Sequence, residues 1–190
     1  MLLMGGGSQR EQELVYNDLS PKADSLKTCI ENGLPALFIG GAYQLLGTSY
    51  QLSTGQIKPR LGIFNFYTKT MDNRLTGNIL IKTNIDNNSV DVVGFENHVG
   101  RIYILDEDLE PFGTVVKGYG NNGEDSTEGI KYKNLIGTHL HGPILPKNPA
   151  VADFFINKIL ERKNIKKNTK LNDELELFAH NQIKKRLLAK

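Results

Sequence analysis

One stretch, residues 34–47, constrains the fold of this 190-residue chain more than any other. It contains the apolar run Ala36-Leu37-Phe38-Ile39, then the pair Gly40-Gly41, and then apolar residues at helical spacing. A buried strand that turns sharply into a helix has this pattern, because a corner without side chains lets the backbone bend tightly. We therefore predict a strand, a sharp turn and a helix over residues 34–47.

The predicted turn has the form of a nucleophile elbow. In hydrolases the residue at such a corner raises its side chain above the sheet edge, and the next backbone N–H contributes to an oxyanion hole. Here the corner residue is Gly40, which carries no side chain. The sequence thus predicts the architecture of a catalytic turn without its attacking group.

Length and composition indicate one domain with a substantial core, since 39% of the residues are hydrophobic and 23% are charged. A formal net charge of +2 argues neither for nor against binding to nucleic acid. The sequence has no run of basic residues interleaved with aromatic residues, so we expect no nucleic-acid partner. No apolar run approaches the roughly 20 residues of a membrane span, and residues 1–4 are too short for a signal sequence. The single cysteine, Cys29, excludes an internal disulfide and suits a reducing compartment. These features predict a cytoplasmic protein without a membrane span.

The first part of the chain alternates strand and helix signals. Residues 1–4 are apolar and lead into Gly5-Gly6-Gly7, which is typical of a strand entering a glycine loop. Residues 9–19 are predicted to be helical. Ser20-Pro21 then supplies an N-cap and a first-turn proline for a second helix, which we expect to end at Asn32-Gly33.

A strand-rich section follows the corner, with short β-type runs separated by Asn, Asp and Gly and a predicted hairpin turn at residues 86–89. The predicted strands cover residues 61–70, 77–85, 90–96, 101–105 and 113–119, and residues 130–140 supply one or two more. Asn148-Pro149 then begins a helix. This order predicts an α/β sandwich over residues 1–162, followed over residues 163–190 by a polar linker (163–170) and a final amphipathic helix (171–188).

Two features outside the corner suit the binding of an anionic group. Gly5-Gly6-Gly7 follows a strand, so its N–H groups are placed to hold an anionic oxygen, although such loops are often plain turns. Arg74 lies in a polar segment, and its guanidinium is either an ordinary surface charge or a fork for a carboxylate.

His141 is the candidate base, because it lies where a predicted strand ends in Gly142-Pro143. Strand alternation places His139 and His141 on one face, which raises a zinc site as the alternative. Zinc needs at least a third ligand, and His98 is the only other histidine of the strand-rich section. We therefore expect no metal.

Several segments together resemble the glutamine amidotransferase subunits of lipid II isoglutaminyl synthases and, more widely, the cobyric-acid-synthase-like glutaminases. The similar segments extend over nearly the whole chain up to about residue 160. They are Gly5-Gly6-Gly7-Ser8-Gln9-Arg10-Glu11-Gln12, the corner through Tyr43-Gln44-Leu45-Leu46-Gly47, Asn73-Arg74-Leu75-Thr76-Gly77, Gly94-Phe95-Glu96-Asn97-His98, Gly118-Tyr119-Gly120-Asn121-Asn122, Glu128-Gly129 and His141-Gly142-Pro143-Ile144-Leu145-Pro146-Lys147-Asn148. The resemblance implies a class I glutamine-amidotransferase-like, flavodoxin-like sandwich.

The resemblance also implies a mechanism. In the family a cysteine at the corner attacks the side-chain amide of L-glutamine and forms a thioester. The freed ammonia passes to a MurT-type Mur ligase, which uses ATP to amidate D-glutamate of lipid II in peptidoglycan synthesis. By position, Gly40 stands where the family has its cysteine, His141 matches the general base, and Arg74 matches the arginine that holds glutamine. Backbone N–H groups near Gly7 and Gly41 match the oxyanion hole, and no cofactor is implied for this chain.

Three departures from the family's pattern shape the expectations. Gly40 removes the thiolate, so we expect negligible glutaminase activity. Many related glutaminases place a glutamate two residues after the histidine, whereas Pro143 stands here, and the resemblance implies that an aspartate of the ligase takes that role. The family also has a further βα unit before the strand at Met1, so the chain is expected to lack its first βα unit and to expose a sheet edge.

Three functions stay open on the sequence. Arg74 and His141 favour a glutaminase subunit that supplies ammonia to a cell-wall ligase. Gly40 favours a non-catalytic subunit that binds the ligase and hydrolyses nothing. The third is an amidotransferase acting on a corrinoid or similar acid. Asn97 and Gly120-Asn121-Asn122 favour the cell-wall branch of the family over this third function.

Overall fold

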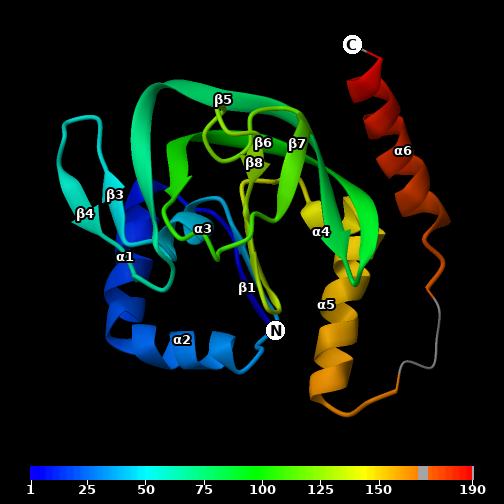
Figure 1. Ribbon diagram of the computed structural model, residues 1–190, viewed down its shortest axis with the longest axis horizontal. Coiled ribbons are helices and arrows are strands. Elements are labelled where there is room, and N and C mark those ends of the chain that lie inside the picture. The colour runs from blue at the N-terminus through cyan, green and yellow to red at the C-terminus, as the bar shows by residue number, and fades with distance from the viewer. Residues whose placement is uncertain (167–170, 190) are drawn as a thin grey trace.

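The computed structural model describes residues 1–166 and 171–189 as two β-sheets flanked by helices (Figure 1). The smaller sheet has the order β1 (Leu2–Met4), β2 (Ala36–Ile39), β10 (Leu135–Thr138), β9 (Ile130–Tyr132). Its first three strands are parallel, and β9 is antiparallel to β10. Because the carboxyl ends of parallel strands meet at one edge, the loops that follow β1, β2 and β10 converge there. These are the loops that carry the predicted site residues.

Strand β2 is buried on both faces. Ala36 and Phe38 belong to a core that also packs against α1 (Gln9–Leu19) and α2 (Ala23–Glu31). Leu37 belongs to a second core on the opposite face, which includes α5 (Pro149–Arg162). All three side chains are fully buried, which explains why the strand is apolar at every position rather than at alternate ones.

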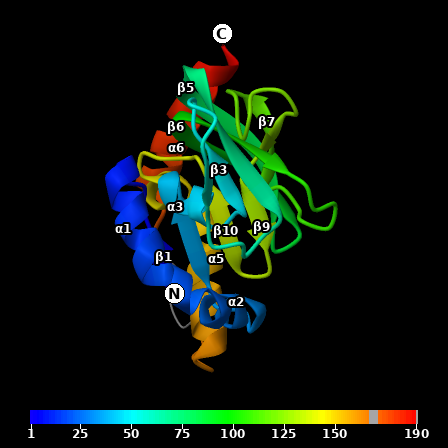
Figure 2. The ribbon, with the colours of Figure 1, turned by 90° about the vertical axis from the view of Figure 1, so that its left-hand side faces the viewer.

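The larger sheet is built around a long hairpin. Its order is β4 (Ile57–Pro59), β3 (Ser49–Gln51), β5 (Phe66–Ile85), β7 (Gly113–Lys117), β8 (Thr127–Glu128), and β6 (Asn88–Ile104) pairs with β5. In both views the β5–β6 hairpin lies above the smaller sheet (Figures 1 and 2). Its turn holds Asp86 and Asn87 at φ 46° and 64°, as a two-residue type I′ turn requires, so the predicted hairpin turn is confirmed.

The prediction of four short strands over residues 61–105 was wrong. Residues 61–65 are not a strand, and the remaining runs join into only two continuous strands, β5 and β6. The Asn, Asp and Gly residues between the runs have low β propensity. They are nevertheless part of the strands, because their backbone groups pair with the facing strand. The three-residue strands β3 and β4 and the four-residue helix α4 (Ile144–Lys147) are too short to leave a periodic signal and were not predicted.

The helical ends differ from the prediction in detail. Ser20 has helical dihedral angles and continues from α1 into a 3-10 turn, Ser20–Lys22, so it is not the N-cap that the sequence suggested. The last helix, α6 (Glu174–Leu188), packs beside α4 and the end of the hairpin. On this helix, the Nδ1 atom of His180 lies 2.9 Å from the carbonyl oxygen of Lys147. Of the predicted linker, residues 167–170 lie outside the described residues.

Within the described ranges, no helix has both the length and the apolar character that crossing a membrane would require.

Candidate functional site

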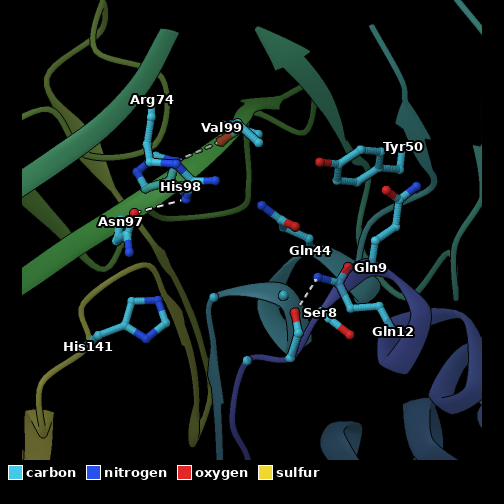
Figure 3. Close-up of a pocket in the computed structure, with 15 residues that line it drawn as sticks. Ser8, Gln9, Gln12, Gln44, Tyr50, Arg74, Asn97, His98, Val99 and His141 are labelled. Atoms are coloured by element: carbon cyan, nitrogen blue, oxygen red, sulfur yellow. Dashed lines mark hydrogen bonds between the residues drawn. The ribbon is translucent and has the colours of Figure 1, made fainter. Parts of the chain in front are cut away.

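A polar cavity of about 470 Å³ opens where the loops after the parallel strands meet the β5–β6 hairpin (Figure 3). The five positions that the sequence singled out all line it: Gly7, Gly40, Gly41, Arg74 and His141. They come from four separate segments of the chain. The fold therefore brings together residues that lie up to 134 positions apart in the sequence.

Gly40 forms the predicted corner between β2 and α3 (Gly41–Leu45). Its backbone has φ 58° and ψ −117°, a conformation that side-chain-bearing residues adopt only under strain. The Gly40 N–H donates to the Thr138 carbonyl oxygen at 2.8 Å, and the Gly40 carbonyl accepts from the Gln44 N–H at 3.1 Å. The strand–turn–helix prediction is thus confirmed.

The His141 imidazole lies directly over the corner. A Cβ atom placed on Gly40 would be 2.8 Å from Cε1 and 2.9 Å from Nε2 of His141. Any side chain at position 40 would therefore touch this ring, and the ring would have to shift slightly to admit it. Burial lowers the pKa of His141, and the neighbouring His98 lowers it further. At pH 7 the ring is therefore neutral, which is the form that accepts a proton.

The glycine loop after β1 approaches the same corner. A Cβ atom on Gly6 would lie 3.4 Å from the Gly41 nitrogen and 3.5 Å from Cε1 of His141. The loop leads into α1, which starts with a capping box: Ser8 N–H donates to Glu11 Oε2 at 2.6 Å, and Glu11 N–H donates to Ser8 Oγ. Because Gly41 is the first residue of α3, its N–H has no acceptor within that helix.

Gln12 is a pocket residue that the sequence analysis did not single out. Its Nε2 donates to the Gly7 carbonyl oxygen at 3.2 Å, and a Cβ atom on Gly41 would overlap its amide group. Gln12 thus packs against both residues predicted to form the oxyanion hole. Its position one turn after the Ser8 cap is the signal that could have found it, since residues four apart share a helix face.

Arg74 lies on the other wall of the cavity. It lies within a break in the β5–β6 register, and its Nη1 donates to Asn97 Oδ1 at 2.9 Å. Figure 3 shows Arg74 and Asn97 on one wall above His141, with Gln12 and Ser8 across the cavity. Tyr50 also lines the cavity and was missed in the sequence, because it belongs to a strand too short to predict.

Behind the Arg74 wall, the rings of His98 and His139 stack in parallel, with centroids 3.8 Å apart and planes at 4°. His139 is fully buried and does not line the cavity, whereas His98 and His141 do. Burial lowers the pKa of His139 well below its usual range, so this ring is neutral. Among the described residues, no group of three or more His, Cys, Asp or Glu side chains is arranged to hold a metal ion.

Glu128, on β8 of the larger sheet, connects the two sheets. Its fully buried carboxyl group accepts hydrogen bonds from Thr138 Oγ1 and from the His139 N–H, the latter at 2.9 Å. Burial raises its pKa to about 7, although these hydrogen bonds act in the opposite direction. The strand end that leads to His141 is therefore anchored from the larger sheet.

Comparison with known proteins gives consistent relatives. The CobB/CobQ-like glutamine amidotransferase domain matches residues 1–149. The lipid II isoglutaminyl synthase (glutamine-hydrolyzing) subunit GatD of Staphylococcus aureus is 47% identical over 180 residues, covering 94% of this chain and 72% of the relative. The subunit of the same name from Streptococcus pneumoniae is 40% identical over 162 residues, covering 84% of this chain and 60% of the relative.

A solved structure supports the same fold. The crystal structure of a glutamine amidotransferase superposes with a TM-score of 0.54 at 14% identity, covering 83% of this chain and 77% of the other. At this identity the likeness concerns the fold alone.

Proposed function

The chain belongs to the CobB/CobQ-like glutamine amidotransferase family and has the predicted glutamine-amidotransferase-like fold, and on that premise we propose that it is the glutamine-binding subunit of a lipid II isoglutaminyl synthase. In this proposal it pairs with a MurT-type Mur ligase, needs no cofactor of its own and leaves the use of ATP to the ligase. Both GatD relatives carry the name of that enzyme. The observation that supports the proposal most directly is one cavity lined by Gly40, His141 and Arg74.

The two walls of the cavity suit the two ends of L-glutamine. The Arg74 guanidinium, oriented by Asn97, offers a planar fork for the α-carboxylate. The side-chain amide would then reach the corner at Gly40. There the Gly41 N–H is available to the amide oxygen and the neutral His141 ring lies beside the amide nitrogen.

The chemistry of the family needs an atom that this chain does not supply. With a cysteine at position 40, His141 would take the thiol proton and the sulfur would bond to the amide carbon. The C–N bond would then break, the proton would leave with ammonia, and water would hydrolyse the thioester to glutamate. Gly40 provides no sulfur, so this chain would bind glutamine and release neither glutamate nor ammonia.

Among the residues that the structure describes, no carboxylate orients the His141 ring. In the described residues no hydrogen bond joins its ring to a carboxylate, and Pro143 stands two positions on. An acid supplied by the ligase partner would complete the arrangement, which makes catalysis by a cysteine-containing version dependent on the complex.

The test is release of glutamate and ammonia from glutamine by the parent chain, by Gly40→Cys and by Gly40→Ala, each with and without the ligase. We expect turnover only for Gly40→Cys, at least about 10³-fold above the other two, because the nucleophile supplies most of the rate. Gly40→Ala adds the same Cβ atom without sulfur and controls for strain at the corner. If Gly40→Cys also fails beside a ligase that is active with added ammonia, the glutaminase ancestry is wrong.

Ammonia supplied directly to the ligase separates the remaining alternative. If the ligase with ammonia requires the parent chain for activity, the chain serves as a non-catalytic binding subunit. If the ligase is equally active without it, the ligase does not need the chain once ammonia is supplied.

A further inference from the structure

Arg74 stands on an irregular part of an otherwise regular hairpin. Pairing of β5 with β6 passes from Thr70–Gly100 directly to Leu75–His98, so residues 71–74 face Val99 alone. Residues of such a bulge lie outside the ladder, and the ladder therefore does not determine where their side chains point. Something else must hold Arg74 in place if its guanidinium is to bind a ligand in a defined position.

The side chain of Arg101 meets this requirement. It is only 4% exposed, and its Nη2 donates to the carbonyl oxygen and to Oδ1 of Asn73, at 2.7 and 3.2 Å. Its Nη1 donates to the Val99 carbonyl oxygen at 3.3 Å. One guanidinium thus joins the residue next to Arg74 to the strand that faces the bulge.

The choice of partners argues that geometry, rather than charge pairing, is what Arg101 provides. All its hydrogen bonds within the described residues go to backbone carbonyls or to an amide oxygen, and none goes to a carboxylate. A buried guanidinium without an ion-pair partner is costly, and the cost is offset only where its fixed array of donors satisfies several acceptors at once. A lysine offers one point of attachment and cannot reproduce that array.

We propose that Arg101 is a positioning residue, which fixes the bulge of residues 71–74 and thereby places the Arg74 guanidinium in the cavity. Arg101 itself does not line the cavity. The ligand named in the test, L-glutamine, rests on the proposed function, whereas the fixing of the bulge does not.

The test is equilibrium binding of L-glutamine to the purified chain, followed by NMR titration, together with hydrogen exchange of residues 71–76. Gly40 makes the measurement direct, because the ligand is not expected to be consumed. We expect Arg101→Lys to weaken glutamine binding about tenfold and to speed exchange in the bulge by a similar factor. The matched control is Val151→Ala, a fully buried change on α5 that lowers stability but should leave both measurements within about twofold.

A double-mutant cycle distinguishes positioning from a general structural role. If Arg101 acts through Arg74, Arg101→Lys should weaken binding by less than about twofold in an Arg74→Ala background. Equal losses in both backgrounds, or unchanged binding and exchange in Arg101→Lys, would overturn the proposal. Should Arg101→Lys fail to fold, Asn73→Ala is the second variant, because it removes one acceptor at the bulge. It should weaken glutamine binding and speed hydrogen exchange in the same way, by smaller factors.

Failure of the proposed function gives a different result. If the parent chain does not bind glutamine at any concentration, the glutamine assignment falls. Hydrogen exchange in Arg101→Lys then decides alone whether Arg101 fixes the bulge.

Discussion

The two walls of the cavity are built by different physical means. One wall consists of the loops after parallel strands β1, β2 and β10, and it carries Gly40 and His141. The other is the antiparallel β5–β6 hairpin, and it carries Arg74 on a bulge. The first wall is positioned by strand ends that are buried on both faces, and the second by side-chain hydrogen bonds across a break in the ladder. In the proposed function the first wall serves the reaction and the second wall serves the binding of glutamine.

A pair of backbone hydrogen bonds joins the two walls at His141. The Phe95 N–H donates to the His141 carbonyl oxygen at 3.2 Å, and the His141 N–H donates to the Phe95 carbonyl oxygen at 2.8 Å. This pair of bonds sets the distance between His141 and the strand that carries Asn97. Movement of the hairpin would therefore displace His141.

The largest expected effect is on glutaminase kinetics, where substitutions on the two walls should act differently in a Gly40→Cys background. His141→Ala should lower kcat by about 10³-fold or more, because the neutral ring both accepts and delivers the proton. Arg74→Ala should raise KM about 10- to 100-fold and change kcat little, because it removes a charge-assisted fork from the substrate. Steady-state kinetics of glutamate release measure both. A fall in kcat for Arg74→Ala as large as that for His141→Ala would contradict this division of roles.

The next effect concerns the seam between the sheets. The pKa of Glu128 is about 7 in the folded chain, above its ordinary value of 4.5. Between those two pH values the folded chain holds a proton that the unfolded chain has lost, so the free energy of unfolding should fall as pH rises, by about 3 kcal/mol in total. Urea unfolding at a series of pH values measures this slope. His139 contributes the opposite slope below its usual pKa.

Glu128→Gln isolates the carboxyl contribution, because the amide does not ionise and His139 is retained. The difference in unfolding free energy between the variant and the parent should shift in favour of the variant by about 2 to 3 kcal/mol from pH 5 to pH 8. A constant difference across this range would show that Glu128 is already ionised in the folded chain at pH 5.

The smallest expected effect compares local stability on the two walls. Ser8→Ala removes the N-cap of α1 and should cost about 1 kcal/mol of unfolding free energy. Thr70→Val, on the opposite wall, removes the hydroxyl that donates to Tyr50 Oη at 3.2 Å and should cost about as much or less. Chemical denaturation measures both. A loss above about 3 kcal/mol for either variant would mean that its wall depends on that single contact.

Much of the first wall was predictable from the sequence. The corner at Gly40 and the strand end before His141 follow from local patterns, because an apolar run flanked by glycine leaves few other backbone solutions. The family resemblance added the roles, including that of Arg74, which spacing alone left as a surface charge or a carboxylate fork. The long hairpin was recognised only in part, since its strands pass through residues of low β propensity.

The sequence by itself determined the strand–turn–helix at Gly40 and the family to which the chain belongs. Only the tertiary structure decided that residues 71–74 bulge, that Arg101 is buried beneath them, and that the His141 ring occupies the space beside Gly40. The physical reason is the range of the interactions involved. Backbone dihedral preferences act within a few residues, whereas strand register and side-chain burial depend on which distant segments pair, and no local pattern encodes that pairing.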